Sequence, residues 1–242
     1  MAVDFVPHGV YEDIINILGK WKVIDMKGLK DFCNYDVKYH NLLKKVRTLE
    51  SHGLIKSVLL GRKDKHIYLT NKGLKLTSYD LTYEICDENL THDLVVGRVL
   101  RELLTYPSFR DGRMFHQIIV DDIYPDAQID GKKNSQNYSV ALEVELTQKS
   151  EVRVKEKFRR YAKDNSFTYA MFISNKEGLY RAYKRYLSEM NPDIQEAVII
   201  LFDKSLSTTK FNYQASNCFY MGKERSFNFL FLDTNTQEDE LN

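Results

Sequence analysis

The residues best suited to chemistry in this 242-residue sequence are carboxylates near two expected strands. Asp126 follows Pro125 in one expected strand, and Glu143 and Glu145 lie in the next, within VALEVELTQKS. Because side chains alternate along a strand, Glu143 and Glu145 share one face, and the apolar residues between them face the core. Two like charges side by side repel each other, so this face is expected to hold something that relieves the repulsion.

A divalent cation would do so, because Mg²⁺ and Mn²⁺ prefer oxygen ligands and keep several bound waters. Such an ion can also lower the pKa of a bound water and stabilise a phosphate under attack. We therefore expect Asp126, Glu143 and Glu145 to be ligands of Mg²⁺ or Mn²⁺ and, with Lys149, to be the catalytic groups. The plainer alternatives are a turn aspartate after proline and two glutamates on the solvent side of an edge strand.

The elements expected to position these carboxylates alternate between helix and strand. The pattern predicts, in chain order, a helix at 90–104, strands at 114–124, 125–130 and 137–146, a helix at 149–164, a strand at 167–174, a helix at 176–190 and a strand at 196–203. A further strand at 226–233 would close the sheet. This order predicts a sheet with flanking helices.

The arrangement resembles the PD-(D/E)XK nuclease superfamily, which has an α-β-β-β-α-β core. The family places Pro-Asp in one strand and Glu-x-Lys in the next, and Pro125-Asp126 and Glu143-Val144-Glu145 match in order and spacing. The resemblance implies a restriction-endonuclease-like fold and metal-dependent cleavage of DNA. Glu145 stands where the family has lysine. Lys149 would then take the role of that lysine from a shifted position in the sequence.

Residues 9–75 are expected to form three helices and a hairpin. Apolar residues at helical spacing mark the first helix from Tyr11 to Leu18, and Asp25 is a suitable N-cap for the second. The third runs from Val37 to His52, where Gly53 stops it. The hairpin strands are expected at 55–60 and 66–70, joined by the turn GRKDK.

The segments LESHGLIKSVLL and GRKDKHIYLTNKGLKL resemble the winged helix-turn-helix domains of MarR-like and PadR-like regulators. In that family the recognition helix ends at a short pattern of a hydrophobic residue followed by Gly, Leu and Ile. A basic wing follows it, and a Leu-Thr-x-x-Gly segment then starts the next helix. The resemblance implies that helix 37–52 and the wing at 61–65 contact duplex DNA.

Charge supports DNA binding independently. Between Val37 and Lys75 there are ten basic and two acidic residues, a surplus of eight that suits phosphate neutralisation with counterion release. A protein-binding winged helix is the main alternative. The expected DNA contacts are Lys38, Lys44, Lys45, Arg47, Arg62, Lys63 and Lys65, with Arg153, Lys157 and Arg160 on one face of helix 149–164 holding the cut strand.

A narrower resemblance spans most of the chain. His92-Asp93, Pro125-Asp126-Ala127, the segment from Glu143 to Ser150, and Arg160-Tyr161 resemble the replication-relaxation and MobC-type relaxase group of plasmids and mobile elements. Such relaxases nick one DNA strand at a transfer origin. The resemblance therefore implies a nickase.

Composition excludes several other classes. Cys33, Cys86 and Cys218 are widely spaced and form no CxxC pair, which argues against a disulfide framework or a structural zinc site. No signal peptide or membrane-spanning apolar run is expected, so the predicted location is the cytoplasm, without membrane contact. The sequence contains no GxxxxGK[ST], GxSxG or HExxH motif, and we expect no nucleotide cofactor.

Together these features predict a two-domain α+β protein. Residues 1–85 would form the winged helix-turn-helix domain, and residues 86–242 an α/β restriction-endonuclease-like core with a mixed sheet. The predicted function is metal-dependent nicking of double-stranded DNA by a relaxase-like or mobile-element protein. Its partners would be DNA and either a second copy of the chain or other DNA-processing proteins. The alternative is a non-catalytic regulator or replication initiator with a degenerate nuclease fold.

Overall fold

The computed structural model describes residues 5–60, 64–79, 87–115 and 124–232. The chain divides into two compact units, one comprising Met1–Gly97 and Met114–Val120, the other Arg98–Arg113 and Asp121–Asn242. The predicted domain boundary, between residues 85 and 86, lies outside the described residues. No helix in the described ranges combines the length and apolar character needed to cross a membrane.

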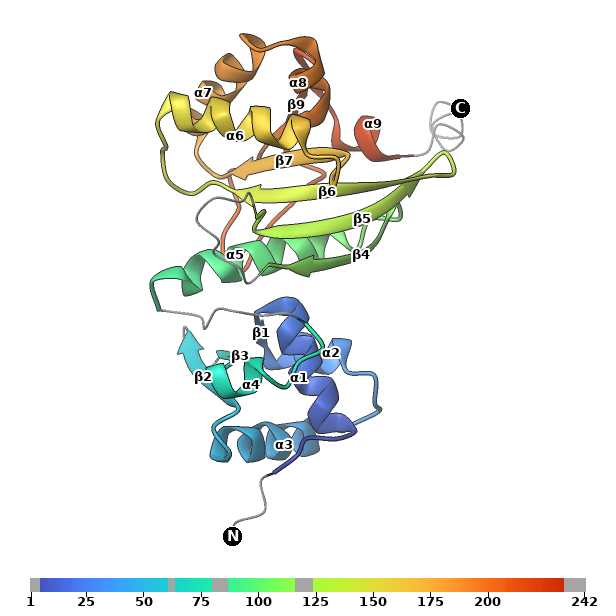
Figure 1. The fold of residues 1–242 in the computed structure, drawn as a ribbon, viewed down its shortest axis with the longest axis vertical. Coiled ribbons are helices and arrows are strands. Elements are labelled where there is room, and N and C mark those ends of the chain that lie inside the picture. Colours follow the sequence, from blue (N-terminus) through green and yellow to red (C-terminus); the bar gives the residue numbers. More distant parts are fainter. Residues whose placement is uncertain (1–4, 61–63, 80–86, 116–123, 233–242) are drawn as a thin grey trace. The chain divides into compact units, whose positions relative to one another are not determined.

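The first unit contains the three helices and the hairpin that the sequence predicts (Figure 1). A short strand that the sequence analysis did not predict joins the hairpin, giving an antiparallel sheet in the order β1-β3-β2. The elements are α1 (Val10–Trp21), β1 (Val23–Asp25), α2 (Met26–Phe32), α3 (Tyr39–Ser51), β2 (Ile55–Leu60), β3 (Asp64–Leu69), α4 (Asn71–Leu74) and the start of α5 (Asp87–Leu103).

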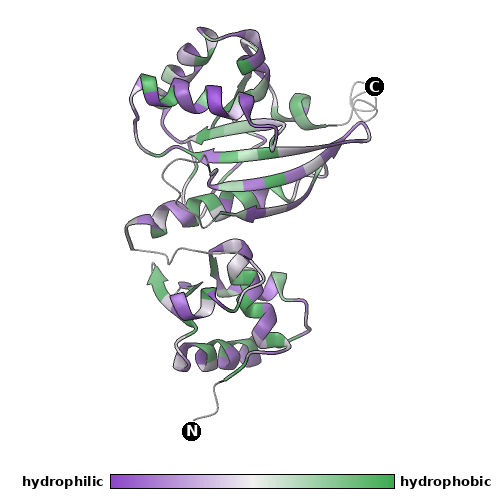
Figure 2. Cartoon of the chain, in the orientation of Figure 1, coloured by the Kyte–Doolittle hydropathy of each residue, from purple (hydrophilic) through white to green (hydrophobic). Residues whose placement is uncertain are grey.

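Local chemistry explains where these helices begin and end. The Asp25 carboxylate accepts a hydrogen bond from the backbone N–H of Gly28 at 2.6 Å and so caps α2. Gly53, just after α3, has a φ of 67°, a left-handed conformation that favours glycine. Leu42 and Val46 of α3 are buried, while the polar face of the helix is exposed to solvent. Purple and green therefore alternate along α3 in Figure 2.

The second unit is built on a mixed sheet. Among the described residues the strand order is β10-β9-β8-β7-β6-β5-β4, and the central strands β6, β7 and β8 run parallel. Helices α6 and α7 lie on one face of this sheet and α5 on the other (Figure 1). The elements are β4 (Phe109–Met114), β5 (Ala127–Lys133), β6 (Gln136–Val144), α6 (Glu151–Lys163), β7 (Tyr169–Ser174), α7 (Glu177–Ser188), α8 (Pro192–Ala197), β8 (Val198–Phe202), β9 (Asn217–Tyr220), β10 (Lys223–Arg225) and α9 (Phe227–Phe231).

The prediction of a closing strand at 226–233 is wrong, because residues 227–231 of this segment form the helix α9. Ser226 caps the helix by accepting a hydrogen bond from the backbone N–H of Phe229 at 3.1 Å. Phe227 and Phe231, one helical turn apart, are buried, whereas Phe229 is half exposed. The sheet instead ends in the hairpin β9–β10. Of the strand expected at 114–124, residues 116–123 lie outside the described residues.

A buried apolar layer fixes the helices on the face of the sheet that carries the carboxylates. Phe158 of α6 and Tyr183 of α7 pack on Phe172 of β7, with ring centroids 4.8 Å and 6.2 Å apart. Ala141 of β6 belongs to the same cluster and lies two residues before Glu143. Since alternate residues of a strand share a face, Glu143 points toward α6 and α7.

Candidate active site

The strand pairing brings Asp126 and Glu143 together. Ala127 pairs with Leu142 in the antiparallel β5–β6 ladder, so Asp126, immediately before β5, lies beside Glu143 on the neighbouring strand. The Asp126 carboxylate also accepts a hydrogen bond from the backbone N–H of Val144 at 2.7 Å. Two carboxylates from separate strands are therefore held next to each other under α6.

Helix α6 provides two partners for Glu143, which is only 3% exposed. The Tyr161 hydroxyl donates a hydrogen bond to Glu143 Oε1 at 2.5 Å, and Lys157 Nζ lies 2.6 Å from Glu143 Oε2. Lys157 and Tyr161 are four residues apart and therefore lie on the same side of the helix. The burial of Phe158 between them holds this side of α6 against the sheet. Both oxygens of the Glu143 carboxylate are thus contacted from α6.

Glu145 is buried at the carboxyl end of β6, where its backbone N–H still donates to the Ile173 carbonyl at 2.8 Å. Its Oε1 lies 2.7 Å from Lys149 Nζ and 3.6 Å from Lys157 Nζ. Lys157 therefore contacts both glutamates, while Lys149 contacts Glu145 from the loop before α6. Glu143, Glu145 and Lys157 form a charged cluster that is almost closed to solvent.

The cluster shifts the protonation of its members. Burial raises the pKa of Glu143 to about 7, helped by the nearby charge of Asp126 and offset by Lys157 and Tyr161. Burial lowers the pKa of Lys157, but the negative charges of Glu143 and Glu145 outweigh it and raise that pKa above its usual value. Near neutral pH Lys157 is therefore charged, and Glu143 is close to its midpoint.

The three predicted metal ligands differ in their surroundings. Over the described residues, no three His, Cys, Asp or Glu side chains are grouped as a metal site requires. Asp126 and Glu143 nevertheless lie close enough for their charges to interact. A pair of carboxylates suits Mg²⁺, which commonly takes one or two protein carboxylates and fills its shell with water and phosphate oxygens. Glu145 is paired with two ammonium groups instead.

The predicted DNA-binding residues also differ in their surroundings. Lys38, Lys44 and Arg47 are exposed on or beside α3. Lys45 lies over the Tyr11 ring at 4.3 Å, and Lys65 Nζ lies 2.7 Å from the Glu50 carboxylate. Arg62 and Lys63 lie outside the described residues.

On α6, the structure separates the three basic residues expected to hold the cut strand. Arg153 and Arg160 are exposed, and Arg160 Nε lies 3.3 Å from the Glu156 carboxylate. Lys157 instead points into the carboxylate cluster, with a side chain 22% exposed. The His92-Asp93 pair belongs to the first unit, where Asp93 forms an ion pair with Lys22 at 2.8 Å.

Sequence reasoning expected Lys157 to hold the cut strand, and it placed neither Lys157 nor Tyr161 in the carboxylate cluster. Their spacing of four around the buried Phe158 puts them on the sheet-facing side of α6, which was a usable signal. Tyr183 of α7 is a third missed residue. Its hydroxyl is buried close to Glu145, and burial together with the charges of Glu145 and Glu143 raises its pKa.

Comparison with known proteins adds little to this geometry. No family model and no curated protein matches the chain. Similar solved structures include the restriction endonuclease FokI bound to DNA, with 16% identity and a TM-score of 0.32 over 80% of this chain and 42% of that chain. A second FokI structure has 14% sequence identity and a TM-score of 0.25, and the match covers 74% of this chain and 39% of that chain. The chain thus spans about two fifths of FokI, and similarity at this level assigns no function.

Proposed function

We propose that this protein is a metal-dependent DNA endonuclease that nicks one strand. The observation that carries the proposal is the buried cluster in which Lys157 contacts Glu143 at 2.6 Å, with Asp126 beside it. A buried carboxyl group with a raised pKa, paired with a lysine and close to a second carboxylate, is typical of a functional site. In this proposal the second unit is a PD-(D/E)XK-like nuclease core.

Each residue of the cluster has a role that its contacts support. Asp126 and Glu143 would hold Mg²⁺ or Mn²⁺, which when bound supplies an activated water and neutralises charge on the scissile phosphate. Lys157 would stabilise the negative charge that develops on the phosphate, the role expected of the lysine that Glu145 replaces. Glu145 would position Lys157, and Tyr161 would orient the Glu143 carboxylate. Lys149 then serves mainly as the partner of Glu145.

We propose further that residues 1–85 form a winged helix-turn-helix domain that binds duplex DNA, with residues 86–242 as the nuclease domain. The order helix, strand, helix, helix, strand, strand supports this proposal, as does the exposure of Lys44 and Arg47 on α3. A helix with exposed basic residues of this kind suits the major groove. Lys38 would add a phosphate contact at the start of the helix.

We propose a nick, rather than a double-strand break, because the described residues contain one such carboxylate cluster per chain. One such site can attack one strand at a time, and cutting both strands needs two sites, as a two-fold symmetric dimer would supply. A relaxase-like role in a mobile element would fit single-strand cutting.

The test is cleavage of supercoiled plasmid in Mg²⁺ or Mn²⁺. We expect open circle as the product, abolished by EDTA and lost in Glu143→Gln. The matched control is Glu156→Gln, an exposed glutamate on α6 that pairs only with neighbouring arginines in the described structure. Cutting that persists in Glu143→Gln, or that is lost equally in Glu156→Gln, would refute the assigned site.

The same cluster also favours a second candidate, a DNA-binding regulator with an inactive nuclease fold. The negative charges of Glu143 and Glu145 are already balanced by Lys157 and Lys149, and this balance could serve stability alone. If the protein is such a regulator, it should bind DNA tightly and in a salt-dependent way, and it should cut no DNA in the presence of Mg²⁺ or Mn²⁺. This candidate also predicts that calorimetric titration with Mn²⁺ gives the same result for wild type and for Asp126→Ala.

A further inference from the structure

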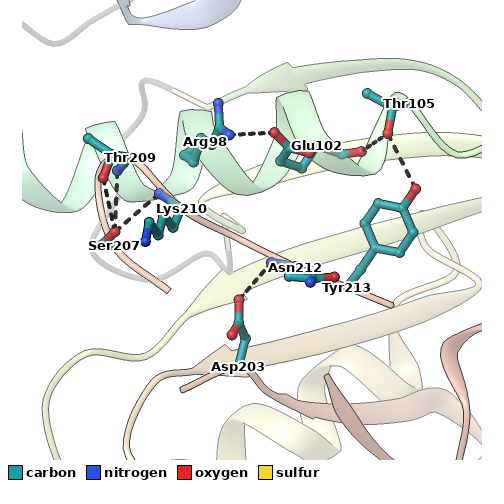
Figure 3. A network of polar contacts seen from close by, with 9 residues as sticks. All are labelled: Arg98, Glu102, Thr105, Asp203, Ser207, Thr209, Lys210, Asn212 and Tyr213. Atoms are coloured by element: carbon teal, nitrogen blue, oxygen red, sulfur yellow. Dashed lines mark hydrogen bonds and ion pairs between the residues drawn. The ribbon is translucent and has the colours of Figure 1, made fainter. Parts of the chain in front are cut away.

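A second polar site lies in the second unit, on the α5 face of the sheet and away from the carboxylate cluster. A cavity of about 490 Å³ opens between α5 and the loop that follows β8. Cavities that bind small molecules have volumes of roughly 300–1,000 Å³. The residues that matter here are Arg98 and Glu102 on α5, and Lys210, Asn212 and Tyr213 on the loop (Figure 3).

The loop that forms one wall is held in a defined shape by Asp203, a buried aspartate just after β8. One oxygen of its carboxylate accepts hydrogen bonds from the Ser205 backbone N–H and hydroxyl, both at 2.8 Å. The other accepts from the Asn212 backbone N–H at 2.7 Å. Tyr213 adds a link to α5, with its hydroxyl 3.3 Å from the Thr105 hydroxyl. The polar groups at the cavity are therefore preorganised.

Among the described residues that line this cavity, charged hydrogen-bond donors outnumber charged acceptors. The side-chain oxygen of Asn212 already accepts from the backbone N–H groups of Gln214 and Ala215, both at 3.1 Å, which leaves its NH₂ group to donate. Arg98 binds Glu102 through one terminal nitrogen at 2.6 Å, but its Nε is buried with no hydrogen-bond partner among the described residues. A buried N–H without a partner is unfavourable, so this group favours a ligand that supplies a hydrogen-bond acceptor.

The charges indicate what that acceptor is. Among the described residues that line the cavity, Arg98 and Lys210 supply two positive charges and Glu102 supplies one negative charge. A guanidinium, an ammonium and an amide NH₂ around one space match the oxygens of a phosphate group. We propose that this cavity binds a phosphate group of a nucleotide, either free or within a DNA strand. The site rests on its own contacts and does not require the proposed nuclease to be active.

The experiment is calorimetric titration of the full chain in EDTA with three probes. Inorganic phosphate presents the group alone, deoxythymidine 5′-monophosphate presents a free nucleotide, and a thymidine trinucleotide without terminal phosphates presents only phosphodiesters. We expect at least one probe to bind, and Lys210→Gln and Arg98→Gln each to weaken that binding about tenfold through loss of a charged hydrogen-bond donor. The probe that binds tells whether the source is a free nucleotide or a strand.

Lys204→Gln is the matched control, because Lys204 is exposed in the same loop but does not line the cavity. It should bind like wild type. The proposal is overturned if no probe binds, or if Lys210→Gln binds as tightly as Lys204→Gln. It is also overturned if Glu143→Gln abolishes binding while Lys210→Gln does not, because the phosphate would then occupy the carboxylate site. Loss of plasmid cutting alone tests the nuclease proposal and leaves this one standing.

Discussion

Replacing Glu143 by glutamine should make the protein more stable at alkaline pH. The pKa of Glu143 is about 7 in the folded protein, against an ordinary value of 4.5, because the side chain is buried beside Asp126. The folded state therefore holds this proton more tightly than the unfolded state. Glu143 contributes stability that is fully present below pH 4.5 and is lost as the pH rises through 7.

The size of the effect follows from the two pKa values. The folded and unfolded pKa values differ by about 2.5. This difference lowers the free energy of unfolding by about 3 kcal/mol when the pH rises from below 4.5 to above 7. Glutamine mimics the protonated glutamate. The free energy of unfolding of Glu143→Gln should therefore equal that of wild type near pH 4.5 and exceed it by about 3 kcal/mol near pH 8.5. In the wild type Lys157 stays protonated over this range, because the negative charges of Glu143 and Glu145 raise its pKa.

The assay is urea unfolding of wild type and Glu143→Gln at several pH values. EDTA is present throughout, because a bound cation would lower the pKa of Glu143. Glu156→Gln, on the exposed side of α6, should follow the pH dependence of wild type. Parallel curves for wild type and Glu143→Gln would refute the reasoning, since they would mean that Glu143 does not titrate in this range.

Three further predictions rest on other contacts. Tyr161→Phe removes a hydrogen bond that lowers the pKa of Glu143, so the Glu143 carboxyl signal should titrate at higher pH in nuclear magnetic resonance spectra; an unchanged midpoint would contradict this. Lys44→Ala with Arg47→Ala should weaken duplex binding and reduce the slope of log K against log salt by about 0.9 per lost phosphate contact, whereas an unchanged slope would argue against these contacts. Gly73→Ala places a Cβ 2.0 Å from a backbone carbonyl oxygen and should lower the unfolding free energy by more than about 2 kcal/mol, as measured in urea.

Elements with a clear periodicity could be predicted from the sequence. The apolar face of α3 and the glycine that follows it located the helix to within two residues, because burial and a positive φ dictate those residue types. The alternation in β6 likewise placed Glu143 and Glu145 on one face. Both are local patterns that need no knowledge of tertiary contacts.

Elements decided by tertiary contacts could not be predicted. Phe227, Phe229 and Phe231 alternate like a strand, yet the Ser226 cap and the burial of Phe227 and Phe231 stabilise a helix. Helical spacing places Lys157 on the buried side of α6 but does not say which carboxylate it meets. That contact depends on how α6 packs on the sheet.

The most direct test of the proposed active site compares two lysines that touch the same glutamate. Lys157 lies 2.6 Å from Glu143 and 3.6 Å from Glu145, whereas Lys149 contacts Glu145. In plasmid nicking with Mn²⁺, we predict that Lys157→Met is slower than wild type by roughly 100-fold or more, the cost of removing a charge-stabilising group. Lys149→Met should retain most of the activity. Wild-type protein that never nicks, or Lys157→Met that nicks as fast as wild type, would contradict the account.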